Sequence, residues 1–283
     1  MKCYILYNPL AGNGKAEKKI SGLSDLYNAE IVKTDVTGID SYKDYFAEVN
    51  KDDMVILCGG DGTINRFVNA TSDAIIPCDV LYYAIGTGND FLRDVDKQDI
   101  KKPFSIKEYI DNLPVVTVKG KRYRFLNNVG FGIDGYCCEV GDEMKKNSPK
   151  PVNYTAVAIK GLLFHYKPTN AVITVDGKEF KYKKVWLAPT MKGRFYGGGM
   201  MPTPAQNRND KEGKLSVMLF YGGGRLRTLM AFPSIFKGEH LKHTKMVAIH
   251  TGKEISVKFD RPAPLQIDGE TILGVTEYTV KAQ

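Results

Sequence analysis

An apolar run at residues 54–58 leads directly into the sequence Gly59-Gly60-Asp61-Gly62-Thr63-Ile64-Asn65. A short run with β-branched members predicts a strand that is covered on both faces, as parallel sheets require. The glycines let backbone N–H groups turn toward an anion, and the start of a helix is a ready phosphate site. Asp61 can hold a magnesium ion and Thr63 can donate to a phosphate oxygen. We therefore predict a phosphate-binding turn, with a tight surface turn as the alternative.

Two more apolar runs in the N-terminal half end in turns rich in glycine and asparagine. Residues 3–7 lead into a loop at residues 8–15, and residues 80–85 lead into Gly86-Thr87-Gly88-Asn89-Asp90-Phe91. Because the carboxyl ends of parallel strands lie at one edge of a sheet, the three turns are expected together where open α/β folds bind ligands.

The three turns also carry a specific resemblance. Asn-Pro-x-Ala-Gly-x-Gly at 8–14, Gly-Gly-Asp-Gly-Thr-x-Asn at 59–65 and Gly-Thr-Gly-Asn-Asp-Phe at 86–91 resemble, in this order, the diacylglycerol kinase catalytic family. That family includes bacterial soluble lipid kinases and the sphingosine kinases. The resemblance continues through the motifs at residues 128–134, 197–200 and 266–270. NAD kinases and phosphofructokinases share only the Gly-Gly-Asp-Gly element.

The pattern of elements predicts two domains. Strands near residues 3–7, 29–33, 53–58 and 80–85 alternate with helical patterns, which is typical of a parallel βαβ layer. After Pro114 the chain is mostly strand-like, with Asp176-Gly177 and Thr251-Gly252 as expected hairpin turns and helical patterns at about 134–146, 153–165 and 225–237. The resemblance implies an α/β plus β fold: an NAD kinase/phosphofructokinase-like ATP-binding α/β domain at 1–114 and a β-sandwich domain at 115–274. It also makes residues 275–283 candidates to return to the first domain.

The resemblance further implies an ATP site in the three loops. Thr34 could equally be a solvated strand end, and Asn89 and Asp90 could serve as a helix N-cap. The implied residues are Asn8, Gly12, Gly14, Thr34, Gly59, Gly60, Asp61, Gly62, Thr63, Asn65 and Thr87, with Asn89 and Asp90 supporting the phosphate and metal network.

Asp268 and Glu270, in Asp-Gly-Glu, match the proton-acceptor motif of the family and carry the base motif of the second domain. Alternation along a strand would place both carboxylates on one face, with Gly269 on the other. In isolation Asp-Gly is usually a hairpin turn, and that alternative stays open here.

A structural magnesium site is implied by similarity at Asn209, Glu212 and Lys214. The family loop usually reads Asp-Gly-x-Leu and uses one carboxylate with backbone carbonyls. Here Glu212 stands where Asp is expected and Ser216 where a further Asp is common. Mg²⁺ tolerates little departure from octahedral geometry, so a longer side chain weakens this assignment. Arg66 is a second departure, because the family usually has Glu there.

The 40 Lys and Arg residues exceed the 32 Asp and Glu residues, giving a formal net charge of +8. The excess favours an anionic membrane as partner over nucleic acid, since no nucleic-acid motif accompanies it. No run approaches the roughly 18 apolar residues of a spanning helix, so lipid contact is expected to be peripheral. Five cysteines without Cys-x-x-Cys spacing indicate reduced thiols and a cytoplasmic chain. Together with the expected lipid contact, this predicts a cytoplasmic protein that associates peripherally with the membrane. A homodimer stays open.

Residues 225–237 mix basic and bulky apolar side chains at helical spacing. A buried helix with solvated arginines is the favoured interpretation, ahead of a membrane-docking face. Elsewhere, His240 and His243 lack a completing ligand set, so zinc is not expected.

The function expected from the motifs is that of a kinase using ATP and Mg²⁺ to phosphorylate a lipid hydroxyl, nominally that of diacylglycerol. Phosphatidylglycerol, a sphingoid base and a prenol are equally open as acceptors. One alternative is a kinase for a soluble acceptor such as NAD. Another is a catalytically silent lipid or nucleotide sensor, which the departures at Arg66, Glu212 and Ser216 favour.

Overall fold

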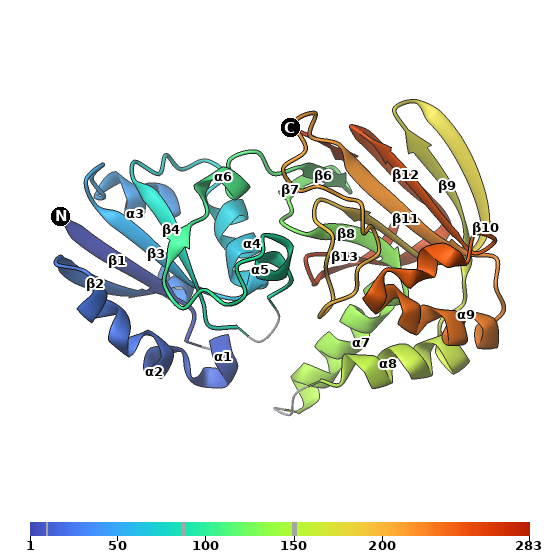
Figure 1. Ribbon diagram of the computed structural model, residues 1–283, viewed down its shortest axis with the longest axis horizontal. Helices are drawn as coiled ribbons and strands as arrows, with labels where there is room; N and C mark the ends of the chain where they lie inside the picture. Colours follow the sequence, from blue (N-terminus) through green and yellow to red (C-terminus); the bar gives the residue numbers. More distant parts are fainter. Residues whose placement is uncertain (10, 87–88, 149–151) are drawn as a thin grey trace. The chain divides into compact units, whose positions relative to one another are not determined.

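The computed structural model describes residues 1–283 except 10, 87–88 and 149–151. The chain divides into two units, Met1–Leu113 and Pro114–Gln283, each with its own sheet (Figure 1).

The sheet of the first unit has the order β2-β1-β3-β4-β5, in which β1 to β4 are parallel and β5 is antiparallel to β4. The four predicted strands of this half are confirmed as β1 to β4. The sequence does not predict β5, because this strand has only two residues and no apolar run. The strands are β1 (Lys2–Tyr7), β2 (Glu30–Asp35), β3 (Met54–Gly59), β4 (Asp79–Ala84) and β5 (Phe104–Ser105).

Helices cover both faces of this sheet, because successive side chains of each buried strand point to opposite sides. Cys3 and Ile5 of β1 pack in a cluster with Ile20 of α2. Tyr4 lies between them in the sequence and points to the other face, where its ring centroid is 6.0 Å from that of Tyr45 in α3. The helical elements are α1 (Ala11–Gly14), α2 (Ala16–Ile20), η1 (Ser21–Leu26), η2 (Val36–Gly38), α3 (Tyr42–Ala47), α4 (Asp61–Ala70), α5 (Asp90–Asp94) and α6 (Lys107–Ile110).

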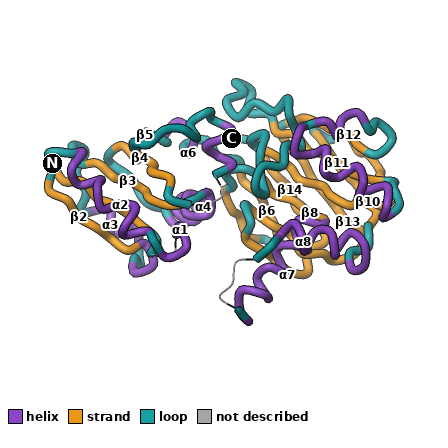
Figure 2. Tube along the Cα trace, turned by 60° about the horizontal axis from the view of Figure 1, so that its bottom comes forward, coloured by secondary structure: helices purple, strands orange, loops and turns teal. Residues whose placement is uncertain are grey.

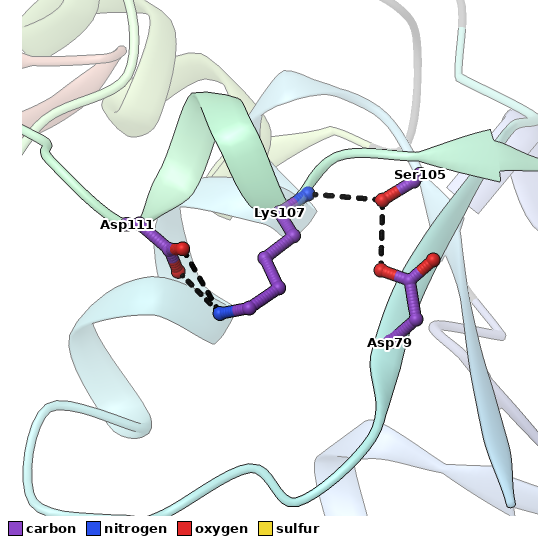
Figure 3. Close-up of polar contacts among 4 residues, drawn as sticks. All are labelled: Asp79, Ser105, Lys107 and Asp111. Atoms are coloured by element: carbon purple, nitrogen blue, oxygen red, sulfur yellow. Dashed lines mark hydrogen bonds and ion pairs between the residues drawn. The ribbon is translucent and has the colours of Figure 1, made fainter. Parts of the chain in front are cut away.

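Side-chain hydrogen bonds fix the short strand at the sheet edge (Figure 3). The Ser105 hydroxyl donates to Asp79 Oδ1 of β4 at 2.7 Å and accepts from the Lys107 amide at 3.4 Å. The Lys107 ammonium in turn donates to both oxygens of Asp111 at 2.9 Å. These contacts attach both β5 and α6 to the edge of β4.

In the second unit a nine-stranded sheet folds over one apolar core. Its order is β12-β11-β10-β8-β13-β14-β6-β7, and β9 pairs with both β10 and β13. Since β8 also pairs with these two long strands, the sheet closes on itself and is sandwich-like. The strands are β6 (Val115–Val118), β7 (Lys121–Arg124), β8 (Asn128–Gly132), β9 (Thr169–Val175), β10 (Lys178–Met191), β11 (Leu215–Tyr221), β12 (Val247–Gly252), β13 (Glu254–Ile267) and β14 (Glu270–Lys281).

The two expected hairpin turns of this unit have different outcomes. Asp176 and Gly177 join β9 to β10 with φ values of 47° and 82°, as a two-residue type I′ turn requires. The prediction for Thr251-Gly252 is wrong, because these residues end β12 and pair with β11. Lys253 and Glu254 follow Gly252 in the sequence, and their amides donate hydrogen bonds to the Asp176 carboxylate. These bonds direct the chain into β13 beside β9.

The last strand also differs from the expectation that residues 275–283 return to the first domain. Residues up to Lys281 belong to β14, which pairs with β13 and β6 of the second unit. Val275, Tyr278 and Val280 are buried in that unit's core, which retains the strand there.

A helical layer covers the second sheet over its own apolar cluster, which includes Cys137, Leu162, Trp186 and Ile235. Figure 2 shows α7 and α8 lying along this sheet. The three predicted helical stretches are confirmed, with π and 3-10 turns at two of their ends. The elements are α7 (Ile133–Asn147), α8 (Tyr154–Lys160), the π turn η3 (Gly161–His165), α9 (Arg225–Ala231), η4 (Phe232–Lys237) and η5 (Glu239–Lys242).

No helix in the described ranges is both long and apolar enough to cross a membrane.

The contact of α7 with β13 gives a stability prediction. A Cβ on Gly135 would lie 2.1 Å from the Pro264 carbonyl oxygen, a backbone atom. Gly135→Ala should therefore lower the free energy of unfolding by about 1–3 kcal/mol, the usual cost of overpacking. Urea unfolding followed by circular dichroism measures it. Gly22→Ala is the control, because its Cβ would meet no described atom within 4 Å. Equal stability of the two variants would contradict the predicted close contact.

Candidate active site

The three glycine turns of the first unit meet at the carboxyl edge of its sheet. A Cβ on Gly12 would lie 2.8 Å from the Ile85 carbonyl oxygen, and one on Gly86 would lie 2.7 Å from Gly60 Cα. The Gly59 carbonyl accepts hydrogen bonds from the amides of Ile85 at 2.9 Å and Gly86 at 3.1 Å. The turns therefore pack backbone against backbone, as expected from the parallel strands.

Helix α4 begins directly at the second turn. A Cβ on Gly59 would overlap Thr63, only 2.2 Å from Oγ1. The Thr63 amide donates to the Gly60 carbonyl at 2.8 Å, while a Cβ on Gly62 would meet no described atom within 4 Å. Because the first N–H groups of a helix lack intrahelical acceptors and carry partial positive charge, this helix start suits a phosphate.

Asp61 connects the second turn to the third. Its Oδ2 accepts a hydrogen bond from the Phe91 amide at 3.1 Å, in the first turn of α5. Asn89 occupies the N-cap position of that helix, but its side-chain amide donates to the Gly86 carbonyl at 3.4 Å. At the start of α5, the Phe91 amide is therefore capped by the side chain of Asp61 and not by that of Asn89. Asp90 is buried, with Oδ1 4.0 Å from Arg93 Nη1.

The other residues expected at the nucleotide have mixed placements. The carbonyl of Asn8 accepts from the Ala11 amide at 2.9 Å, at the start of the first loop. The Thr34 hydroxyl shares a hydrogen bond with the Tyr45 hydroxyl at 3.0 Å. Asn65 is buried within α4 and its carbonyl accepts from Asn69. Gly14 ends α1 with a φ of 74°. Thr87 lies outside the described residues.

In the second unit, Asp268 and Gly269 form the turn between β13 and β14. Their φ values are 46° and 91°, and Ile267 pairs with Glu270 across the turn. The prediction that Asp268 and Glu270 alternate on one strand face is therefore wrong, and the hairpin alternative is correct. Asp and Gly tolerate positive φ, which explains why the chain reverses at this point.

The Asp268 carboxylate holds a distant segment of backbone. It accepts hydrogen bonds from the amides of Leu126, Asn127 and Asn128, the last two at 2.8 and 2.9 Å. Arg208 contacts the same segment, donating to the Leu126 carbonyl at 2.6 Å and to Asn127 Oδ1 at 2.7 Å. Residues 126–128 are thus fixed between a carboxylate and a guanidinium.

A buried carboxylate, Asp134, is connected to this turn. Gln266 links Asp134 to the turn. Its Oε1 accepts from the Gly269 amide at 2.9 Å, and its Nε2 donates to Asp134 Oδ2 at 3.2 Å. Tyr196 also donates to Asp134, at 3.4 Å. Burial raises the pKa of Asp134, and hydrogen bonds from Gly135, Gln266 and Tyr196 oppose that rise.

Asp134 and Gln266 stood within motifs that carried the resemblance, yet no role was predicted for them. Arg208 and Lys192 have no sequence signal, because each lies in an irregular stretch outside the recognised motifs. Lys192 is buried, and its amide donates to the Asn127 carbonyl at 2.9 Å. Burial and the nearby Arg208 lower the pKa of Lys192.

In the loop expected to hold a structural magnesium, the Glu212 carboxylate and the Lys214 carbonyl already have partners within the protein. Glu212 Oε2 lies 2.8 Å from Lys214 Nζ, so its charge is already paired. Asp210 accepts from the Lys214 amide, and the Asn209 amide donates to Asn207. Within the described ranges, no group of three His, Cys, Asp or Glu side chains could hold a metal. No step of the reaction is assigned to a metal at this loop.

Family comparisons agree with both units. Residues 2–116 match the diacylglycerol kinase catalytic domain, and residues 127–282 match the YegS C-terminal NAD kinase beta sandwich-like domain.

Individual relatives are distant but extend over most of the chain. The Bacillus subtilis protein named "Putative lipid kinase YtlR" is 25% identical over 274 residues, covering 89% of this chain and 82% of the relative. A Mycobacterium tuberculosis protein named "Diacylglycerol kinase" is 25% identical over 254 residues, covering 85% and 80%. A Bacillus anthracis crystal structure titled "a putative diacylglycerol kinase" has a TM-score of 0.69 at 20% identity, covering 99% and 91%. At that identity the structure shows the shared fold.

The contacts of Asp268 predict different stabilities for two charge-removing variants. Asp268→Asn tolerates the positive φ but replaces one acceptor oxygen with a donor, so it should lower the free energy of unfolding by about 1–3 kcal/mol. Glu270→Gln changes an exposed side chain and should cost less than about 1 kcal/mol. Urea unfolding measures both. Equal losses would show that the three amide bonds contribute nothing measurable.

The buried Asp134 predicts a pH dependence. Its pKa is raised above 3.8 in the folded protein, so the ionised carboxylate lowers stability, and this penalty disappears as the pH falls through the folded-state pKa toward 3.8. Asp134→Asn removes the titration. Its unfolding free energy relative to the parent should therefore decrease as the pH falls from neutral to about 4. A difference that stays constant over this range would contradict the raised pKa.

Proposed function

Because this chain belongs to the diacylglycerol kinase catalytic-domain family and carries a YegS-type C-terminal domain, we propose that it transfers the γ-phosphate of ATP to a lipid hydroxyl. Diacylglycerol is the first candidate acceptor, since relatives from two bacterial genera bear the name "Diacylglycerol kinase". The observation that carries the proposal is the meeting of three glycine turns at one sheet edge, in front of the start of α4.

The first unit is proposed to bind the nucleotide. Gly59, Gly60 and Gly62 let the phosphates approach the backbone, and the N-terminus of α4 stabilises their charge. The Thr63 hydroxyl is proposed to donate to a phosphate oxygen. Asp61, held by the Phe91 amide, has the hard oxygen donors that Mg²⁺ prefers, and Asp90 follows in the next turn. When bound, Mg²⁺ would neutralise charge on the phosphates.

The second unit is proposed to supply the base. Both oxygens of Asp268 already accept hydrogen bonds from backbone amides, so we assign it the task of holding the turn. Glu270 is exposed and is the first residue after the turn. We assign it the acceptance of the proton from the attacking lipid hydroxyl, a step that allows the hydroxyl oxygen to bond to phosphorus.

A peripheral, cytoplasmic association with anionic membrane is part of the proposal. The net charge of +8 supports attraction to anionic headgroups, and a lipid acceptor must be reached at a bilayer surface.

The test is transfer of labelled γ-phosphate from ATP and Mg²⁺ into a panel of micelle-dispersed lipids. Asp61→Asn and Glu270→Gln should each lose label, Glu270→Gln by about 10²–10⁴-fold, the usual contribution of a general base. Asp73→Asn and Glu277→Gln are matched controls at exposed positions of the same units and should keep parental activity. Asp268→Asn, assayed where it stays folded, should lose less than Glu270→Gln.

Each other outcome has a defined meaning. A larger loss in folded Asp268→Asn than in Glu270→Gln would assign the base to Asp268. Label in NAD without any lipid present would favour the soluble-acceptor alternative. ATP binding without label in any acceptor would replace the kinase proposal with a sensor.

A further inference from the structure

One surface of the second unit exposes large apolar side chains on adjoining elements. Phe164 of the π turn η3 is 70% exposed, and Leu226 and Met230 of α9 are 69% and 76% exposed. We call these three residues the η3–α9 surface. Each is far more exposed than an apolar side chain that only fills a gap in the core, so the surface needs an explanation beyond packing.

The two elements are held together. Arg225, the first residue of α9, donates from Nη1 to the Leu162 carbonyl of η3 at 2.8 Å, and its guanidinium lies 5.9 Å from the centre of the Trp186 ring. Figure 1 shows α8, which runs into η3, beside α9. The η3–α9 surface is therefore a built feature of the fold.

The inner side of α9 explains why its outer side stays exposed. Thr228 and Ala231 are buried, and Ala231 packs in the helical-layer cluster with Leu162 and Ile235. Leu226 and Met230 are four residues apart and so share one helix face. The interpretation as a buried helix is thus correct for the side of α9 that carries Thr228 and Ala231. The membrane-docking alternative applies to the exposed side, which carries Leu226 and Met230.

Basic residues are the only charged residues in the two segments that carry this surface. Residues 154–165 and 225–237 contain Lys160, Arg225, Arg227 and Lys237 but no Asp or Glu, in a chain that has 32 acidic residues. The end of α7, which packs on α8, carries both signs: Lys145 lies 3.6 Å from Asp142, next to Glu143 and Lys146. An apolar patch on two segments whose charged residues are all basic matches an anionic interface with an apolar interior.

A second copy of this chain fits the surface poorly. A two-fold interface joins the same patch on both copies, which would bring each set of cations close to its equivalent. Like charges facing one another across an interface are unfavourable. The charge pattern therefore distinguishes a lipid surface from self-association.

We infer that the η3–α9 surface docks this protein on anionic bilayers. Phe164, Leu226 and Met230 enter the boundary between headgroups and acyl chains, while the exposed Lys160, Arg227 and Lys237 contact lipid phosphates. The inference rests on the proposed function for its purpose, since docking would bring the chain to a lipid acceptor. Docking itself can be measured without nucleotide or turnover.

The experiment is co-sedimentation of the full chain with vesicles of phosphatidylcholine alone or mixed with phosphatidylglycerol. The parent should bind the mixed vesicles, and the double variant Leu226→Gln/Met230→Gln should bind them about tenfold more weakly or less. Arg227→Glu/Lys237→Glu should lose the preference for anionic vesicles. The control Ile75→Gln/Leu273→Gln removes apolar side chains that are 86% and 56% exposed elsewhere and should bind like the parent.

The kinase assay separates this inference from the proposed function. Leu226→Gln/Met230→Gln should keep parental activity on micelle-dispersed lipid and lose activity on lipid within vesicles. A parent that binds anionic vesicles but has no kinase activity would support docking and overturn the kinase proposal. Vesicle binding that is absent in the parent, or unchanged in both surface variants, would overturn docking. Dimers in the parent that Leu226→Gln/Met230→Gln abolishes, with vesicle binding unchanged, would assign the surface to self-association.

Discussion

The nucleotide half of this protein depends on direct contact between backbones at three glycine turns. The Gly59 carbonyl accepts from the amides of Ile85 and Gly86, and Gly86 lies so close to Gly60 that a Cβ would be 2.7 Å from its Cα. Without such contacts the turns could not meet at one sheet edge, and α4 could not begin where a phosphate would be held. Side chains at these positions would separate the strand ends, so the glycines determine the site as well as the fold.

The second half depends on a different constraint, the long-range bonds of one carboxylate. Asp268 accepts from amides about 140 residues earlier in the chain, and Gln266 extends the same network to the buried Asp134. The motifs at residues 128–134 and 266–270 thereby become one polar cluster at a tight turn. The three amide hydrogen bonds to Asp268 and the bond from the Gly269 amide to Gln266 hold the turn in one conformation. That conformation presents Glu270 on the exposed side.

These two halves show how far local patterns reach. Glycine turns after apolar runs located the strands β1 to β4, since burial on two faces and the lack of a Cβ are properties of short segments. The same reasoning misplaced Thr251-Gly252, because the pairing of β12 with β11 is decided by sheet closure. Asp-Gly at 268–269 has the propensity for a hairpin turn, yet the motif alone did not decide between turn and strand.

The sequence by itself determined the family, the order of the parallel strands' loops and the residue types available for phosphate and proton chemistry. The tertiary structure decided which of those residues make hydrogen bonds within the fold, as Thr34 and Asp268 do, and which residues outside any motif join a cluster, as Arg208 and Lys192 do. It also decided that Leu226 and Met230 stay exposed while Ala231 is buried. The reason is physical: propensity and periodicity act over a few residues, whereas burial and hydrogen-bond partners depend on segments that meet only when the sheets close.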